Sequence, residues 1–420
     1  MSRAPRASVH RHPWWQVVTW APHRAMFAAG AVQACFAMAW WMIVVMDRFA
    51  DWYTLPQLVV SPDWVHGYLM VYGVFPFFML GFLMTALPSW VDQQRPGPEY
   101  YLPSAALMFA GVALFYPGIY WSEVLVYLGL VLQLAGWLVA LVALAQKVFN
   151  SQGQDLRHPL VVLAGMAIGA LGLFLFNLSL VLRERGGAEL AMWGGIWMFL
   201  FPVFVTVAHR MIPYFSSRVI ENYKVVRPYW ALWVLLAAGV GHGLAMIIGF
   251  DRFAWVTDVP GVAVSLYLIA AWRIDRCMGN RLLAVLHIAF LWLPVAFALS
   301  AWQSFGQHHL SGLIHLNVHH LVPLHALAIG FFSSMLIGMA SRVSLGHSGR
   351  PLVADTATWV AFLAVNAAAV GRVAAEMPWA VAVSGPLLGL SAAVWLLAFC
   401  GWAVKYLPMV LMPRVDGKLG

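Results

Sequence analysis

Residues 64–87 read WVHGYLMVYGVFPFFMLGFLMTAL and contain no Asp, Glu, Lys or Arg. A run of about 20 apolar residues is long enough to cross the hydrocarbon core of a bilayer as a helix. The whole chain has this character: of its 420 residues, 62% are hydrophobic and 10% are charged, whereas soluble domains average about 45–50% and about 25%. So few charges cannot coat a globule in water, and the composition excludes a soluble enzyme and a disordered chain.

Eleven further stretches have the length and composition of membrane spans. The twelve predicted spans are 25–46, 64–87, 101–119, 124–145, 159–182, 188–209, 228–249, 253–272, 282–303, 317–341, 353–371 and 379–404. Short loops rich in Gly, Pro and polar residues separate them, and none of these loops could hold a folded domain. The sequence therefore predicts an all-α polytopic membrane protein, a bundle of about 12 transmembrane helices that forms a single domain over residues 1–420 within a lipid bilayer.

The distribution of Lys and Arg predicts the orientation. When the short basic N-terminal segment 1–24 is placed in the cytoplasm, 19 of the 24 Lys and Arg residues fall on the cytoplasmic side, as the positive-inside rule expects. Both termini are then cytoplasmic, and the net charge of +8 requires no nucleic-acid partner. The first span is too long for the apolar region of a signal peptide, so we expect it to be retained.

The positions of the cysteines and acidic residues argue against several kinds of site and two functions. Cys35, Cys277 and Cys400 are scattered and form no C-x-x-C motif, which argues against a disulfide framework, a thiolate zinc site and covalently attached c-type haem. Asp and Glu are nearly absent from the interior of the spans. A cation-coupled transporter or proton pump usually uses carboxylates there, so both functions are disfavoured.

Histidine is the ionisable residue that remains at membrane depth, and the predicted topology sorts ten of its fifteen copies into two layers. The outer layer contains His66, His325 and the cluster His308, His309, His315, His319 and His320; the inner layer contains His209, His287 and His347. Histidines outside these layers, among them His10, His12, His23 and His158, are expected to be solvated or interfacial.

Neutral imidazole is a ligand of copper and of haem iron. His315 and His319 would share one face of a helix that begins at His315, whereas His319 and the adjacent His320 would point about 100° apart. The cluster is therefore either a metal site or a polar outer vestibule. Arg342 and Arg350 either clamp haem propionates or mark the inner interface.

Several motifs in the chain resemble those of the NnrS family. His325-Ala-Leu-Ala-Ile-Gly330, followed by Arg342-Val-Ser-Leu-Gly346-His347-Ser-Gly-Arg350, is similar to the family's H-A-L-T-x-G and R-x-x-L-G-H-T-G-R. His66 opens the second span, which ends in Gly81-Phe-Leu-Met-Thr-Ala-Leu-Pro88-Ser-Trp90, like the family's G-F-L-L-T-A-x-P-N-W. Leu286-His287-Ile-Ala-Phe-Leu-Trp292 is similar to L-H-x-G-Y-x-W. The likeness extends over essentially the whole chain.

The resemblance implies a twelve-helix protein of the bacterial inner membrane that contains haem and copper and takes part in nitric oxide metabolism and in resistance to nitrosative stress. It does not supply a reaction. The histidines that match family motifs are His66, His287, His325 and His347. The chain departs from the family at Ala208-His209, where Gly-Gly is usual, and at Tyr68, where a second histidine is common.

We therefore predict a redox-active haem b protein, with copper as a second metal, that handles nitric oxide or a nitrosylated small molecule. His66 and His325 are predicted as axial ligands across the outer layer. The inner site is predicted from His287 and His347, with Arg350 or Arg342 compensating anionic groups. The copper ligands are predicted among His315, His319 and His320. The sequence does not identify the electron donor.

Two alternatives belong to other functional classes. One is a transporter or metal-handling protein with a histidine-lined path, although no internal sequence repeat of the kind common in transporters is evident. The other is a reductase similar to the haem-copper oxidases, which requires an adjacent His-His pair, an H-x-x-x-Y-like motif and a nearby H-x-H. His319-His320 supplies the first element, and the other two are absent.

Overall fold

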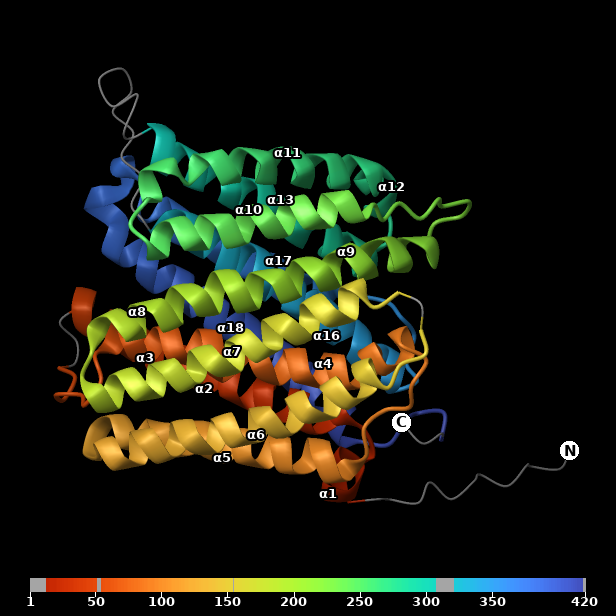
Figure 1. The fold of residues 1–420 in the computed structure, drawn as a ribbon, viewed down its shortest axis with the longest axis horizontal. Helices are drawn as coiled ribbons and strands as arrows, with labels where there is room; N and C mark the ends of the chain where they lie inside the picture. The colour runs from red at the N-terminus through yellow and green to blue at the C-terminus, as the bar shows by residue number, and fades with distance from the viewer. Residues whose placement is uncertain (1–12, 51–53, 154, 307–320, 418–420) are drawn as a thin grey trace, which may run out of the picture.

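The computed structural model describes residues 13–50, 54–153, 155–306 and 321–417, and all of the regular structure in these ranges is helical. In chain order the helices are α1 (Trp14–Val17), η1 (Val18–Trp20), α2 (Pro22–Ala50), α3 (Pro62–Tyr68), η2 (Leu69–Val74), α4 (Phe75–Trp90), α5 (Pro98–Trp121), α6 (Glu123–Phe149), α7 (Arg157–Leu182), α8 (Arg185–Gly194), η3 (Gly195–Leu200), α9 (Phe201–Ser217), α10 (Tyr229–Ile247), η4 (Asp251–Phe253), α11 (Trp255–Ala271), α12 (Ile274–Cys277), α13 (Arg281–Ala301), η5 (Trp302–Gly306), α15 (Leu321–His325), η6 (Ala326–Ser333), α16 (Ser334–His347), α17 (Thr356–Ala374), η7 (Pro378–Val383) and α18 (Ser384–Leu411). Figure 1 shows the long helices lying side by side as a bundle.

Eleven helical segments within the described residues are long and apolar enough to cross a membrane. The eighth predicted span corresponds to a shorter apolar helix, α11, of 17 residues, which is about 25 Å long at 1.5 Å per residue. In Figure 1, α11 runs beside α10 and α13, so it returns the chain across the bundle. Each predicted span overlaps one of these twelve helices, and the predicted fold class is confirmed.

The second, sixth and tenth crossings, 62–90, 185–217 and 321–347, are the three most enclosed spans. Each of them contains a π-helical segment in its first half: η2, η3 and η6. A π-helical turn widens the helix locally and is common near functional sites. The second, sixth and tenth crossings therefore lie at the centre of the bundle. This spacing of four crossings is not accompanied by an evident repeat in the sequence.

Three phenylalanines, one from each central crossing, meet where these crossings pack together. The Phe75 and Phe204 ring centroids are 5.6 Å apart, Phe75 and Phe332 are 6.0 Å apart, and Phe204 and Phe332 stack at 4.7 Å. Next to this triad is a cavity of about 50 Å³ lined by apolar side chains of α2, α4, α9 and α16. The side chains that line it are all apolar, so this part of the bundle centre is apolar.

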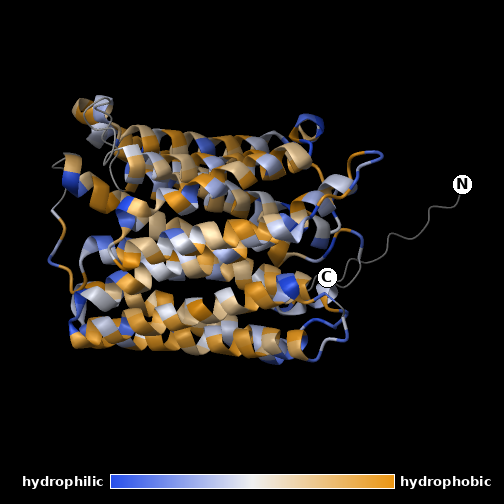
Figure 2. Ribbon diagram, turned by 45° about the horizontal axis from the view of Figure 1, so that its top comes forward, coloured by the Kyte–Doolittle hydropathy of each residue, from blue (hydrophilic) through white to orange (hydrophobic). Residues whose placement is uncertain are grey.

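The outside of the bundle is also apolar, as the hydrophobic colouring of the helices in Figure 2 shows. On α18, Leu390, Leu397 and Val404 repeat every seven residues and are among the most exposed apolar side chains of the chain. Seven residues are nearly two helical turns, so these side chains form one stripe along the helix. A stripe of this length facing outward is suited to lipid, and the bilayer is the environment of the chain.

Glycines allow the closest helix pair, α5 and α6, to pack backbone against backbone. A Cβ atom placed on Gly111 would lie 2.4 Å from the carbonyl oxygen of Gly129 and 2.6 Å from the amide nitrogen of Gln133. A Cβ atom on Gly136 would lie 2.7 Å from the carbonyl oxygen of Ser104. Small residues at such contacts stabilise helix pairs in membranes because they permit close van der Waals approach.

We expect Gly111→Ala to destabilise the protein, because the atoms that the new methyl group would meet belong to the backbone and can move only if α5 and α6 separate. Overpacking of this kind costs about 1–3 kcal/mol. Gly401→Ala on α18 is the matched control, since no described atom lies within 4 Å of a Cβ atom at that position. Thermal melting in detergent should show a lower Tm for Gly111→Ala only; equal values would contradict the close packing.

Candidate functional site

The polar side chains of the bundle lie mainly in an outer and an inner layer, defined by the orientation inferred from Lys and Arg. In the outer layer, His66 lies on α3, just before the π-helical segment η2. Its ring stacks on that of Trp41 with centroids 3.9 Å apart and an angle of 17°. Its Nδ1 atom is buried and has no hydrogen-bond partner among the described residues. An unpaired buried ring nitrogen is costly, so His66 is a candidate ligand.

His325, the other outer-layer candidate, is the last residue of α15, directly before the π-helical segment η6. Its Nδ1 atom lies 2.8 Å from the carbonyl oxygen of Leu321. A carbonyl oxygen only accepts hydrogen bonds, so Nδ1 carries the hydrogen and Nε2 carries the lone pair. A backbone carbonyl that fixes the tautomer in this way is a usual partner of a metal-ligating histidine.

A largely buried ion pair at the C-terminal end of α17 accompanies the outer layer. Arg372 and Glu376 are in contact at 2.9 Å, and their side chains are only 14% and 13% exposed. The Arg372 and Arg48 guanidinium groups lie within electrostatic reach of His66, and α17 packs on α15, which carries His325. Arg372 and Glu376 were not among the predicted site residues, although an Arg and a Glu four residues apart at the end of an apolar helix are a recognisable signal of an ion pair.

In the inner layer, His347 lies against His23, with ring centroids 4.6 Å apart. The backbone N–H of His23 donates to the hydroxyl of Thr85 at 3.2 Å. His23 and His158 are not solvated, as one alternative of the prediction had it, because their exposed fractions are 1% and 0%. The helices α2 and α7 begin at Pro22 and Arg157, slightly before the predicted spans, so both histidines lie in the first turn of a packed helix. His10 and His12 lie outside the described residues.

Cationic side chains surround the pair formed by His23 and His347. Arg24 is buried, and its Nη1 atom donates to the carbonyl oxygens of Val410 and Met412 at 2.9 and 2.8 Å, at the end of α18. These carbonyls are at the negative end of the helix dipole. Arg414 forms a 2.6 Å ion pair with Asp416 and donates to the carbonyl of His347 at 3.3 Å.

The other predicted inner-layer residues have separate surroundings. The Nε2 atom of His287 lies 3.2 Å from the hydroxyl of Ser216 on α9. The guanidinium carbon of Arg342 lies 3.9 Å from the ring centroid of Phe215. The Nη1 atom of Arg350 is buried and has no hydrogen-bond partner among the described residues. His347 therefore lies against the ring of His23, whereas His287 lies beside the hydroxyl of Ser216.

Asp258 is a polar residue that the sequence analysis missed. It lies in the first turn of α11, is fully buried, and accepts a 2.9 Å hydrogen bond from Nδ1 of His242 on α10. The His242 ring also packs on Trp197, with centroids 4.2 Å apart. The sequence signal was present, because Asp258 is an acidic residue within the predicted eighth span.

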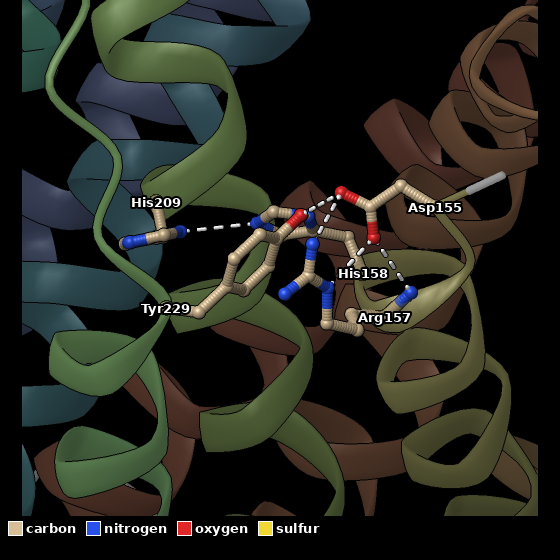
Figure 3. Close-up of polar contacts among 5 residues, drawn as sticks. All are labelled: Asp155, Arg157, His158, His209 and Tyr229. Carbon is tan, nitrogen blue, oxygen red and sulfur yellow. Dashed lines mark hydrogen bonds and ion pairs between the residues drawn. The ribbon is translucent and has the colours of Figure 1, made fainter.

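A hydrogen-bonded cluster lies at the inner ends of α7, α9 and α10 (Figure 3). His158 bonds to His209 and to Tyr229, and Tyr229 donates to Asp155. Arg157 forms a 2.9 Å ion pair with Asp155, and its guanidinium carbon lies 3.4 Å from the centroid of the Tyr229 ring. The cluster begins at a partly exposed carboxylate and ends at two fully buried imidazoles.

Within the described ranges, no three side chains of His, Cys, Asp or Glu converge as a metal site would require. The predicted copper ligands His315, His319 and His320 fall in the range 307–320, outside the described residues. Copper binding by these residues therefore stays a prediction.

The sequence pattern of the NnrS family, described as NnrS protein, matches residues 17–414. The chain belongs to the NnrS family. No individually curated protein matches it. Membership makes the chain a multi-pass membrane protein of the nitric oxide response.

The NnrS match covers both layers of polar side chains. His66 and His325 of the outer layer, and His287 and His347 of the inner layer, lie on four different elements: α3, α15, α13 and α16. The departure from the family at His209 belongs to the cluster of Figure 3. The histidines predicted from the family resemblance and the cluster of Figure 3 thus both lie within the range that the NnrS pattern matches.

We expect His242→Leu to destabilise this NnrS protein strongly, because it removes the hydrogen bond to a fully buried carboxylate. Breaking a buried pair by removing one partner costs about 3–5 kcal/mol. His242→Asn keeps a donor and should lose less, and Asp258→Asn in the His242→Leu background should recover part of the loss because it removes the charge. Melting temperatures in detergent measure this series. An unchanged Tm for His242→Leu would show that the pair does not stabilise the fold.

Proposed function

We propose that the protein handles nitric oxide or a nitrosylated small molecule in the bacterial inner membrane, by redox chemistry at a histidine-ligated haem b. Membership of the NnrS family supports the connection with nitric oxide. The observation that carries the assignment of a site is the buried Nδ1 atom of His66, which has no hydrogen-bond partner among the described residues.

The residues of the outer layer fit a haem by their donor chemistry. A haem iron takes neutral imidazole nitrogens as axial ligands. His66 offers a ring nitrogen that is unpaired within the described structure, and the hydrogen bond from Nδ1 of His325 to the carbonyl oxygen of Leu321 orients the His325 ring. His66 and His325 are the residues that would hold the haem. When bound, the haem supplies an iron that can change oxidation state and coordinate nitric oxide.

The protein's own charges suit the anionic edge of such a group. Arg48 and Arg372 lie within electrostatic reach of His66, and guanidinium groups bind carboxylates with paired, planar hydrogen bonds. Glu376 neutralises part of the charge of Arg372. Trp41, which stacks on His66, holds the imidazole plane in place. These residues would orient the axial ligand and bind propionates.

The inner layer is the second place where a cofactor could bind. His347 and His23 face each other there, Arg24 provides buried donors, and Arg350 has a buried unpaired nitrogen. We propose that the haem binds in the outer layer and that His315, His319 and His320 are the copper ligands. The electron donor is a further component that the proposal requires.

Transport along a histidine-lined path receives less support. The three central crossings meet through Phe75, Phe204 and Phe332, and the adjacent cavity is apolar. A polar solute would lose its hydration there without gaining hydrogen bonds. The described centre of the bundle is therefore unsuited to a permeating ion.

The proposal is tested by the reduced-minus-oxidised visible spectrum of the purified full-length protein, with iron and copper analysis of the same sample. We expect a b-type α band that shifts when nitric oxide is added. Either His66→Ala or His325→Ala should lower the haem content several-fold, because each removes an axial ligand. His242→Asn is the matched control, since it changes a buried histidine of another pair and keeps its hydrogen bond.

The same experiment has two outcomes against the proposal. A wild-type protein that is colourless when made in haem-replete cells would contradict haem binding altogether. Full haem content in both His66→Ala and His325→Ala, with loss in His347→Ala, would place the haem in the inner layer. Analytical size exclusion of each variant distinguishes loss of haem from loss of fold.

A further inference from the structure

The cluster at the inner ends of α7, α9 and α10 contains a continuous chain of hydrogen bonds from Asp155 through Tyr229 and His158 to His209 (Figure 3), and His209 extends it to the carbonyl oxygen of Pro228. Nε2 of His209 lies 3.1 Å from the carbonyl oxygen of Pro228, and Nδ1 of His209 lies 3.0 Å from Nε2 of His158. Nδ1 of His158 lies 3.1 Å from the hydroxyl of Tyr229, which also bonds to the carboxylate of Asp155.

Both ends of this chain are acceptors. The carbonyl oxygen of Pro228 has no hydrogen to give. At the other end, Arg157 donates two side-chain hydrogen bonds to Asp155, of 2.9 and 3.3 Å, and these, with the bond from Tyr229, hold the pKa of the Asp155 carboxyl well below its usual value. Asp155 is therefore a carboxylate and can only accept.

Because both ends of the chain only accept hydrogen bonds, the number of hydrogens that the chain needs can be counted. Four hydrogen bonds need four hydrogens, one in each. Neutral His209, neutral His158 and Tyr229 supply one each, so the neutral chain is one hydrogen short. Because Tyr229 donates to Asp155 and His209 donates to Pro228, His158 would have to donate from both of its ring nitrogens.

We propose that Asp155, Tyr229, His158 and His209 form a proton-binding site at the cytoplasmic face, in which the bound proton makes His158 an imidazolium. The proton enters from the aqueous side at Asp155. Tyr229 passes its own hydrogen to Nδ1 of His158 and takes the hydrogen of Asp155, which becomes a carboxylate again. One proton is gained, the chain gains one positive charge, and no other bond changes.

Opposing charges make this proton exchangeable. Burial of His158, the neighbouring His209 and the cations Arg210 on α9 and Arg227 before α10 oppose the imidazolium, whereas the Asp155 carboxylate favours it. Arg157 on α7 lies over the Tyr229 ring and is paired with Asp155. When the proton leaves, the contact between His158 and Tyr229 loses its hydrogen, so the link between α7 and α10 weakens. The site thus couples cytoplasmic pH to the packing of these helix ends, with or without haem.

Two substitutions remove the need for the fourth hydrogen in different ways. Tyr229→Phe leaves two hydrogen bonds, for which the two neutral histidines suffice. Asp155→Asn keeps all four bonds and supplies the missing hydrogen from its own amide. Tyr223→Phe is the matched control, because the Tyr223 hydroxyl donates to the carbonyl of Trp272 at 3.3 Å in a neighbouring loop and does not belong to the chain.

The test is ¹⁵N NMR of histidine-labelled full-length protein in lipid nanodiscs, with the His158 signals assigned from His158→Gln. In wild type we expect both ring nitrogens of His158 to carry hydrogen at a pH where one of them is bare in Tyr229→Phe and Asp155→Asn. The midpoint of the titration should fall by roughly one pH unit or more in both variants, a unit being the scale of typical environmental shifts. It should not change in Tyr223→Phe.

Two results would overturn the inference. One is a wild-type His158 that keeps one bare ring nitrogen throughout about pH 5–8, the range in which histidine usually changes its charge. The other is a shift of both the His158 and His209 signals on adding one equivalent of zinc, which would make the pair a metal site. If Tyr229→Phe does not fold, Asp155→Asn still tests the inference, because it preserves every hydrogen bond of the chain.

Discussion

A polar group inside a bilayer has no water to pair with, and the arrangement of this bundle follows from that constraint. Arg24, Arg372 and Asp258 each have at least one partner that comes from the protein. Arg24 donates to the carbonyls at the end of α18, Arg372 pairs with Glu376, and Asp258 accepts from His242. In contrast, the buried Nδ1 atom of His66 has no hydrogen-bond partner among the described residues. This unpaired atom is the reason for proposing that a ligand binds beside His66.

The same constraint separates the two polar layers. The aromatic triad of Phe75, Phe204 and Phe332 and the apolar cavity beside it occupy the centre of the bundle. These apolar side chains lie between the outer layer and the cluster of Figure 3, and no hydrogen-bond chain of the described residues crosses them. A haem in the outer layer and a proton site at the inner face would communicate only through movements of shared helices.

Sequence patterns predicted the crossings because length and apolarity alone determine them. The same reasoning placed His66, His287, His325 and His347 on spans or at span ends, but it could not pair them, because the partners lie on other helices. His23 and His158 are buried rather than solvated because α2 and α7 begin earlier than the predicted spans. Asp258 and the chain through Tyr229 become visible only when α7, α9, α10 and α11 are packed together.

The contact between Arg24 and the end of α18 has a consequence for biogenesis. Arg24 lies in α2, and the carbonyls of Val410 and Met412 lie 386 and 388 residues later in the chain, at the end of α18. The first helix enters the membrane with a cation whose acceptors have not yet been made. Because α2 is synthesised before α18, the buried hydrogen bonds of Arg24 can form only after the end of α18 has been made and has packed on α2.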